Sequence, residues 1–169
     1  IMNLDHCNSH SSFKDKVSMS NLCQEITLPT TPIQDIHDDQ GEIALCILSA
    51  VNVGGLNDLG ELESICDLAV RALEQIIDYQ DYPVKAAEVS TKKRRSLGIG
   101  YIGLAHYLAK HGVKYSDPKA WDLVDRLSEA FQFHLLKASN NLAKEKGKCE
   151  GFDRTKYADG LLPIDHYKK

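Results

Sequence analysis

A thiol stands between an amide and a carboxylate in the sequence NLCQEI, which occupies residues 21–26. The residues that follow, TLPTTP, are typical of a short extended segment that runs into a turn. Because alternate side chains of an extended chain point to the same side, we expect Asn21, Cys23 and Glu25 to share one face. An amide, a thiol and a carboxylate make a poor hydrophobic core, so this pattern indicates a chemical site.

The remaining cysteines suggest neither a disulfide framework nor a metal motif. The chain has five cysteines at irregular spacing, and its 169 residues can bury a core without disulfides. We therefore expect free thiols, and we expect any disulfide between them to be catalytic rather than structural. The cluster of His6, Cys7 and His10 lacks a second pair of ligands elsewhere in the sequence, so no metal site is expected.

Composition and charge favour a single soluble domain. Hydrophobic residues make up 43% of the chain, which excludes a disordered composition. The net charge is −4, so no basic excess suggests direct binding to nucleic acid. No apolar run approaches the roughly 20 residues that span a bilayer. The first residues lack the features of a signal peptide, and we expect a cytoplasmic location.

Two short strands are expected in the first third of the chain. The apolar run IALCIL at residues 43–48 has the length of a strand buried on both faces. Together with residues 21–26 it has few local partners, which predicts exposed sheet edges and association or partial disorder near residues 1–50. A strand without partners in its own chain indicates a piece of something larger.

Three helices are expected in the rest of the chain. The first carries an apolar stripe over residues 62–77, with Asp58 as its cap and Cys66 as a core residue. The second is expected over residues 97–110, before a glycine stop. The third is expected over residues 116–147, with a proline in its first turn.

Two features around the second helix resemble ligand sites. The connection at residues 81–96 contains four basic residues at 92–95, which predict a solvated loop or, alternatively, a contact for an anion. Gly98, Gly100 and Gly103 form a GxGxxG pattern. A dinucleotide site needs a strand immediately before this pattern, and KKRRSL is no buried strand. We therefore interpret the glycines as small residues that allow close packing early in a helix.

Several motifs together resemble the catalytic subunit of class I ribonucleoside-diphosphate reductase, in the branch found in enteric bacteria and their large phages. They are SNLCQEITLPT, GEIALCILSA, RRSLGIG, YSDPKA, LLKASNNLAKEKG and LLPIDHYKK, and they cover essentially all 169 residues. The resemblance implies an α/β fold, in which this chain is a helix-rich segment of a ten-stranded α/β barrel. Residues 1–56 would supply the finger loop and strand region, residues 57–147 three helices, and residues 148–169 an irregular tail.

The resemblance also implies a role for each site residue. Cys23 matches the cysteine that becomes a thiyl radical and abstracts the 3′-hydrogen of the ribose, and Glu25 matches the general base for the 3′-hydroxyl. Asn21 matches an amide that binds the ribose hydroxyls. Cys46 matches one member of the redox-active cysteine pair, whose partner lies outside this chain. Leu48 matches a position that lines the nucleotide pocket.

The chemistry of the reaction agrees with these residue types. Homolysis of a ribose C–H bond needs a one-electron oxidant whose own bond to hydrogen is comparably strong, and a thiyl radical meets that need. Loss of the 2′-hydroxyl as water is helped when a carboxylate removes the proton from O3′. The reducing thiol must approach from another element, and a cysteine in the strand at residues 43–48 suits that role.

The resemblance implies partners but no cofactor bound in this segment. The family takes its radical from a metal-containing small subunit, its electrons from thioredoxin or glutaredoxin, and its substrate as a ribonucleoside diphosphate. The first redox cysteine, the allosteric sites, the phosphate loop, the tyrosine pair and the C-terminal cysteines of the family have no match here. We therefore expect the chain to need the remaining segments of the catalytic subunit for activity.

Other classes of protein remain possible from the sequence. The chain could be a helical interaction module that has lost its enzymatic role, or a thiol–disulfide protein that uses Cys23 and Cys46. A glycyl-radical enzyme shares the barrel architecture, but a second cysteine fits reduction by a dithiol better.

Overall fold

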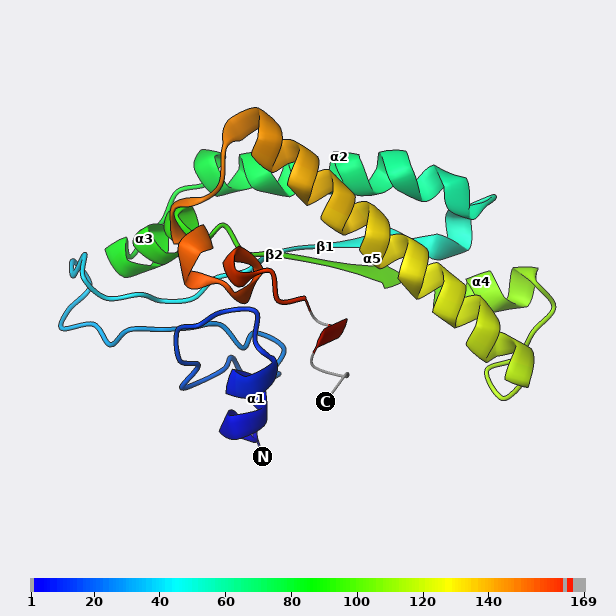
Figure 1. Ribbon diagram of the computed structural model, residues 1–169, viewed down its shortest axis with the longest axis horizontal. Helices are drawn as coiled ribbons and strands as arrows, with labels where there is room; N and C mark the ends of the chain where they lie inside the picture. Colours follow the sequence, from blue (N-terminus) through cyan, green and yellow to red (C-terminus); the bar gives the residue numbers. More distant parts are fainter. Residues whose placement is uncertain (1, 163, 166–169) are drawn as a thin grey trace. The chain divides into compact units, whose positions relative to one another are not determined.

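The structure is a computed structural model that describes residues 2–162 and 164–165 (Figure 1). Its helices are α1 (Leu4–His10), α2 (Leu62–Tyr79), α3 (Lys85–Arg94), α4 (Leu104–Lys110) and α5 (Pro118–Lys146), and its strands are β1 (Ile47–Asn52) and β2 (Leu97–Ile102). Four 3-10 helices complete it: η1 (Val53–Gly55), η2 (Leu59–Glu61), η3 (Glu150–Arg154) and η4 (Lys156–Asp159). None of the described helices is long and apolar enough to cross a membrane.

The described chain divides into two compact units. The first consists of the described parts of residues 1–46, 77–96 and 148–169, and the second of residues 47–76 and 97–147. The predicted site residues Asn21, Cys23, Glu25 and Cys46 belong to the first unit, and Leu48 belongs to the second.

The second unit contains a parallel pair of strands, β1 and β2. Ile47 lies opposite Leu97, and Asn52 lies opposite Ile102. Parallel strands need a long crossover connection, which α2 and α3 supply in the chain between them. The expectation of a strand without partners in its own chain is therefore wrong for β1, because β2 pairs with all six of its residues.

The partner strand β2 occupies residues for which the sequence predicted a helix. Leu97, Ile99 and Tyr101 pack against α2 and α5, and the residues between them face the other way. This period of two defines a strand, so the prediction of a helix from residue 97 is wrong, and α4 begins only at Leu104. Gly103 joins the two elements at a φ of 79°, where an added Cβ would come within 2.4 Å of Asn52 Oδ1.

The strand β1 is shifted along the chain from its predicted position. Of the predicted residues 43–48, only Ile47 and Leu48 belong to it, and it continues to Asn52. Its side chains alternate between half-buried and exposed, and Leu48 is 59% exposed. The prediction of a strand buried on both faces is wrong for the described chain, because helices cover only one face of this sheet.

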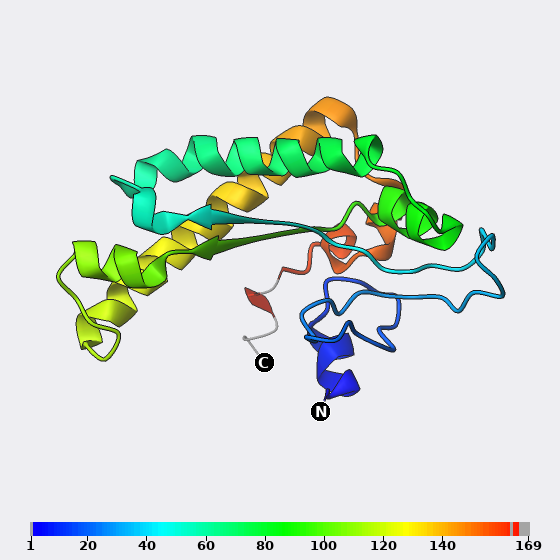
Figure 2. The same ribbon diagram turned by 180° about the vertical axis from the view of Figure 1, so that it is seen from behind.

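The two long helices agree with the sequence pattern. In both views α2 runs alongside the strands, and α5 crosses them obliquely (Figures 1 and 2). Leu62 and Cys66 of α2 meet Leu127 and Phe131 of α5 in the core. Cys66 is completely buried, which confirms it as a core residue. Asp58 caps η2, one turn before α2, by accepting a hydrogen bond from the Gly60 amide at 2.7 Å.

The first unit contains a helix that the sequence pattern did not reveal. Residues 81–96 were expected to form a loop, and most of them form α3. Its buried side chains are small or polar, and they include Ala86, Ala87 and Thr91. Such a face shows no apolar stripe in the sequence. Only part of the predicted irregular tail can be compared with the structure, because Pro163 and residues 166–169 lie outside the described residues.

A buried ion pair holds α3 to the segment that leads to Cys46. Arg94 Nε donates to Glu42 Oε2 at 2.6 Å, and Lys93 Nζ donates to Glu42 Oε1 at 2.6 Å. Arg94 NH1 also donates to Asp15 Oδ2 at 3.0 Å, and Arg154 binds the other oxygen of Asp15. The prediction that the basic residues 92–95 form a solvated loop is therefore wrong for Arg94, whose side chain is 6% exposed.

The same ion pair perturbs the ionisation of Glu42. Burial raises the pKa of this carboxyl, but hydrogen bonds from Arg94 and Lys93 outweigh it and hold the pKa below its usual value of 4.5. Glu42 also exchanges two backbone hydrogen bonds of 3.0 Å with Thr31. One residue thus joins α3 to both ends of the loop at residues 31–42.

Replacing Leu127 by alanine should lower the free energy of unfolding by about 2–5 kcal/mol, because this side chain is completely buried between α2, α4 and α5. Leu136→Ala, on the same helix but 41% exposed, is the matched control and should cost clearly less. Urea denaturation followed by circular dichroism measures both. Equal losses from the two variants would contradict the described core.

Replacing Glu42 by glutamine should lower the free energy of unfolding at pH 7 by about 3 kcal/mol, because Arg94 would keep its buried charge and lose a partner. The folded-state pKa of Glu42 lies below the unfolded value of about 4.5. The contribution of the carboxylate is therefore complete above pH 4.5 and disappears as the pH falls through the folded-state pKa.

The stability difference between the original protein and Glu42→Gln should accordingly shrink on acidification, which urea denaturation at several pH values would measure. Glu88→Gln removes a carboxylate that pairs with Lys85 and Lys92 at the surface, and it should change stability little at pH 7. A difference at Glu42 that is independent of pH would contradict the ion pair.

Candidate functional site

The NLCQEI segment forms a tight turn at the surface of the first unit. The Gln24 amide donates to the Asn21 carbonyl oxygen at 3.1 Å, and Gln24 has a φ of 63°. The sequence predicted an extended segment with alternating faces, and that prediction is wrong because a left-handed residue reverses the chain direction here. Asn21, Cys23 and Glu25 nevertheless all lie in one short, exposed turn.

The side chain of Asn21 closes this turn. Its Oδ1 accepts from the Ile26 amide at 3.0 Å and lies 3.2 Å from Ser20 Oγ. A backbone N–H can only donate, so the oxygen of the amide must face Ile26. The Nδ2 group then points away from this contact, and it has no hydrogen-bond acceptor among the described residues. It is therefore available to donate to a ligand.

The thiol of Cys23 and the carboxylate of Glu25 are exposed and unengaged. Residues 21–25 are all exposed to solvent, and Leu22 at the tip is 97% exposed. No hydrogen bond or ion pair joins either functional group to another described residue. A thiol and a carboxylate two residues apart are therefore both accessible to a ligand that approaches the turn.

Cys46 lies in a more protected position in the same unit. Its side chain is half-buried, and burial raises the pKa of its thiol. Cys23 and Cys46 are both free thiols. No direct contact joins the two thiols among the described residues, so the structure does not link Cys46 to the turn at residues 21–26.

The uncovered face of the β1–β2 sheet surrounds Leu48 with small residues. Leu48 lies opposite Gly98, and Ala50 lies opposite Gly100. An atom added at the Cβ position of Gly100 would meet nothing within 4 Å. This face can accept a flat or apolar group. Gly98 and Gly100 are thus candidate binding residues that sequence reasoning missed, although their spacing of two was the available sign of a strand face.

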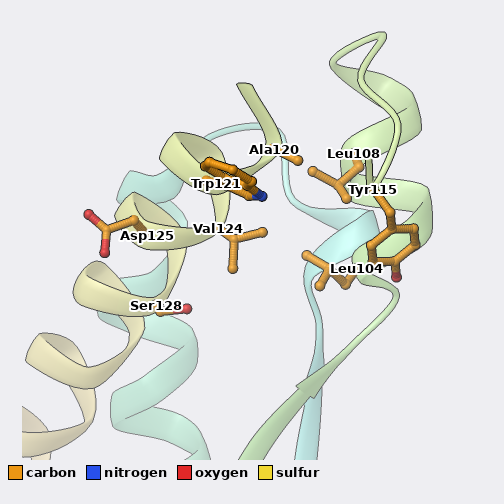
Figure 3. Close-up of a pocket in the computed structure, with 8 residues that line it drawn as sticks. All are labelled: Leu104, Leu108, Tyr115, Ala120, Trp121, Val124, Asp125 and Ser128. Atoms are coloured by element: carbon orange, nitrogen blue, oxygen red, sulfur yellow. The ribbon is translucent and has the colours of Figure 1, made fainter. Parts of the chain in front are cut away.

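Two hollows of the second unit contain none of the predicted site residues. One, of about 420 Å³, is lined by Leu104 and Leu108 of α4, by Tyr115, and by Trp121 and neighbouring residues of α5 (Figure 3). The other, of about 500 Å³, lies between α2 and α5, where Lys137 pairs with Glu63. Within the described chain, no group of three or more His, Cys, Asp or Glu side chains is placed to hold a metal ion.

Comparison with known proteins gives a family match over the whole chain. Residues 1–169 match the family described as ribonucleotide reductase, barrel domain. The ribonucleoside-diphosphate reductase subunit alpha of Haemophilus influenzae is 60% identical over 172 residues, and the ribonucleoside-diphosphate reductase 1 subunit alpha of Escherichia coli is 56% identical over 172 residues. The subunit alpha of Enterobacteria phage T4 is 41% identical over 171 residues.

These relatives are much longer than the chain. The alignments cover 100%, 100% and 98% of this chain, but only 23%, 23% and 22% of the respective relatives. The chain therefore spans less than a quarter of the length of the proteins that it matches.

The exposures of the cysteines predict an order of chemical modification. Iodoacetamide at pH 8 should modify Cys23 first and Cys46 more slowly, because burial of Cys46 limits both access and thiolate formation. Cys66 should react on the order of tenfold more slowly than Cys23, or slower still, since its sulfur is reached only when the core opens.

Mass spectrometry of the digested protein after timed labelling measures the three rates. Labelling in 8 M urea is the control, and it should make the rates similar because all three thiols are then exposed. Modification of Cys66 as fast as Cys23 in the folded protein would contradict the described burial.

Proposed function

Since the chain belongs to the ribonucleotide reductase barrel-domain family, we propose that it forms part of an alpha subunit that reduces ribonucleoside diphosphates to 2′-deoxyribonucleoside diphosphates. The observation that carries this proposal is the turn at residues 21–26. It carries the Cys23 thiol and the Glu25 carboxylate two residues apart, both exposed and without a hydrogen-bond or ion-pair partner among the described residues. The activity supplies the precursors of DNA synthesis.

In this proposal Cys23 performs the hydrogen-atom transfer. Its sulfur, as a thiyl radical, takes the hydrogen from C3′ of the ribose and leaves a carbon radical there. Glu25 accepts the proton of the 3′-hydroxyl, which assists departure of the 2′-hydroxyl as water. The Nδ2 group of Asn21 donates to a ribose hydroxyl and orients the sugar, so that the sulfur meets C3′.

Cys46 supplies reducing equivalents in the same proposal. Together with a second cysteine outside this chain it gives up two electrons and two protons, and the pair becomes a disulfide. The balance is one ribonucleoside diphosphate and two thiols consumed, and one deoxyribonucleoside diphosphate, one disulfide and one water formed. At the end of the cycle the hydrogen returns from Cys23 to C3′, which restores the thiyl radical.

Leu48 and the uncovered sheet face would contact the nucleotide. The exposed Leu48 side chain beside Gly98 and Gly100 offers an open apolar surface, which suits the flat faces of a sugar or base.

The proposed partners follow from the same family. They are the remaining segments of the alpha subunit, a small subunit that generates the radical with its own metal centre, and thioredoxin or glutaredoxin as the reductant. No cofactor would be held by the described residues. Allosteric control would lie in other segments of the subunit, and the location would be cytoplasmic.

A chimera tests the proposal directly. Residues 1–169 would replace the matching segment of a complete related alpha subunit, and CDP reduction would be measured with its small subunit and a dithiol. The chimera should turn over, and Cys23→Ser should abolish turnover, because serine cannot form a thiyl radical. Cys7→Ser, in α1, is the matched control and should leave turnover unchanged.

Two results would contradict the proposal. One is full turnover by the Cys23→Ser chimera. The other is no turnover by a chimera that folds and binds its small subunit, which would favour a segment that has lost its catalytic role. Reduction of CDP by the 169-residue chain alone would show that the remaining segments are not needed.

A further inference from the structure

The turn that carries Cys23 has no buried side chain to hold its shape. Residues 21–25 are all exposed, so packing of their side chains cannot define where the sulfur lies. Gln24 adopts a left-handed conformation, which is unfavourable for a residue other than glycine. Hydrogen bonds that close the turn must therefore offset this cost and set its geometry.

Two side chains close the turn on the same residue. Asn21 Oδ1 accepts from the Ile26 amide at 3.0 Å, and Ser20 Oγ donates to the Ile26 carbonyl oxygen at 2.9 Å. Ser20 Oγ also lies 3.2 Å from Asn21 Oδ1, so the hydroxyl contacts both the closing residue and its amide partner. Cys23 and Glu25 lie between the two ends that these contacts join.

We propose that Ser20 is a positioning residue for the reaction of Cys23, acting through Ile26 and Asn21. This inference rests on the proposed function. Ser20 Oγ contacts none of the reacting groups in the described structure, and its side chain is half-buried, whereas Cys23 is exposed. Without the hydroxyl, the Ile26 carbonyl would bind water, and the sulfur would sample a wider range of positions relative to C3′.

The size of the effect follows from the single hydrogen bond that is lost. A hydrogen bond of this kind changes an equilibrium by about 2- to 12-fold. The fraction of molecules in which residues 21–26 place the sulfur correctly should fall by a similar factor, and the rate of hydrogen transfer should fall with it. The loss should appear in kcat, because Ser20 does not contact the substrate and Asn21, which does so in the proposed function, keeps its own hydrogen bond to the Ile26 amide.

The first measurement uses the 169-residue chain and reports on the turn itself. Hydrogen exchange at the Ile26 amide, measured by NMR, should be about 2- to 12-fold faster in Ser20→Ala than in the original protein. Ser20→Thr keeps a hydroxyl and should restore the slower exchange. Ser18→Ala is the matched control, because Ser18 Oγ contacts Thr30 Oγ1 at 3.3 Å and not Ile26.

The second measurement uses the chimera and reports on the reaction. Ser20→Ala should lower kcat for CDP reduction by about 2- to 12-fold and leave KM unchanged, while Ser20→Thr should recover most of the rate. A purely structural role would instead lower thermal stability and leave the kcat of the folded fraction unchanged.

The outcomes separate this inference from the function on which it rests. Unchanged exchange at Ile26, or faster exchange with an unchanged kcat, would overturn the role of Ser20 while Cys23→Ser remained inactive. Retention of turnover by the Cys23→Ser chimera would overturn the proposed function itself. Faster exchange together with a lower kcat that Ser20→Thr rescues is the result expected.

Discussion

The contact between Glu42 and Arg94 is the constraint on which the first unit depends. Two charges that are 7% and 6% exposed must find partners, because an unpaired buried charge is strongly unfavourable. Glu42 pairs with Arg94 at the end of α3, and the Arg94 guanidinium pairs with Asp15 as well. The network therefore fixes α3, the approach to the Cys23 turn and the approach to Cys46 against one another, without a large apolar core.

A different constraint organises the second unit. In the described residues its sheet has two strands, and α2 and α5 cover a single face. A parallel pair normally has both faces covered, so the exposed Leu48 and Ile102 on the other face are unusual for a complete parallel sheet. The small residues Gly98 and Gly100 make this face open. Such a surface fits a sheet that is only part of the barrel domain after which the family is described.

The sequence predicted the helices that bury apolar side chains at a regular helical spacing. The stripes of α2 and α5 were visible for that reason, whereas α3 buries small and polar side chains that leave no stripe. The strand β2 was missed because its apolar residues also fit a helical spacing. The residues of β1 that pair with it also lie 50 positions earlier in the sequence. In the site, the residue types were evident, but nothing in the sequence reveals that Gln24 is left-handed. The roles of Cys23, Glu25 and Cys46 came from the family resemblance and not from the spacing alone.

The surroundings of Cys23 favour hydrogen-atom transfer over nucleophilic catalysis. Nucleophilic cysteines are activated by a neighbouring cation, a histidine base or the N-terminus of a helix. In the described residues, Cys23 has no hydrogen-bonded histidine and no ion-pairing group, and it lies in a turn rather than at a helix. A sulfur that reacts as a radical needs no such activation, because it exchanges a hydrogen atom rather than a proton. In the proposed function the sulfur needs a fixed position near a carboxylate, and the hydrogen bonds within the turn at residues 21–26 would hold it there.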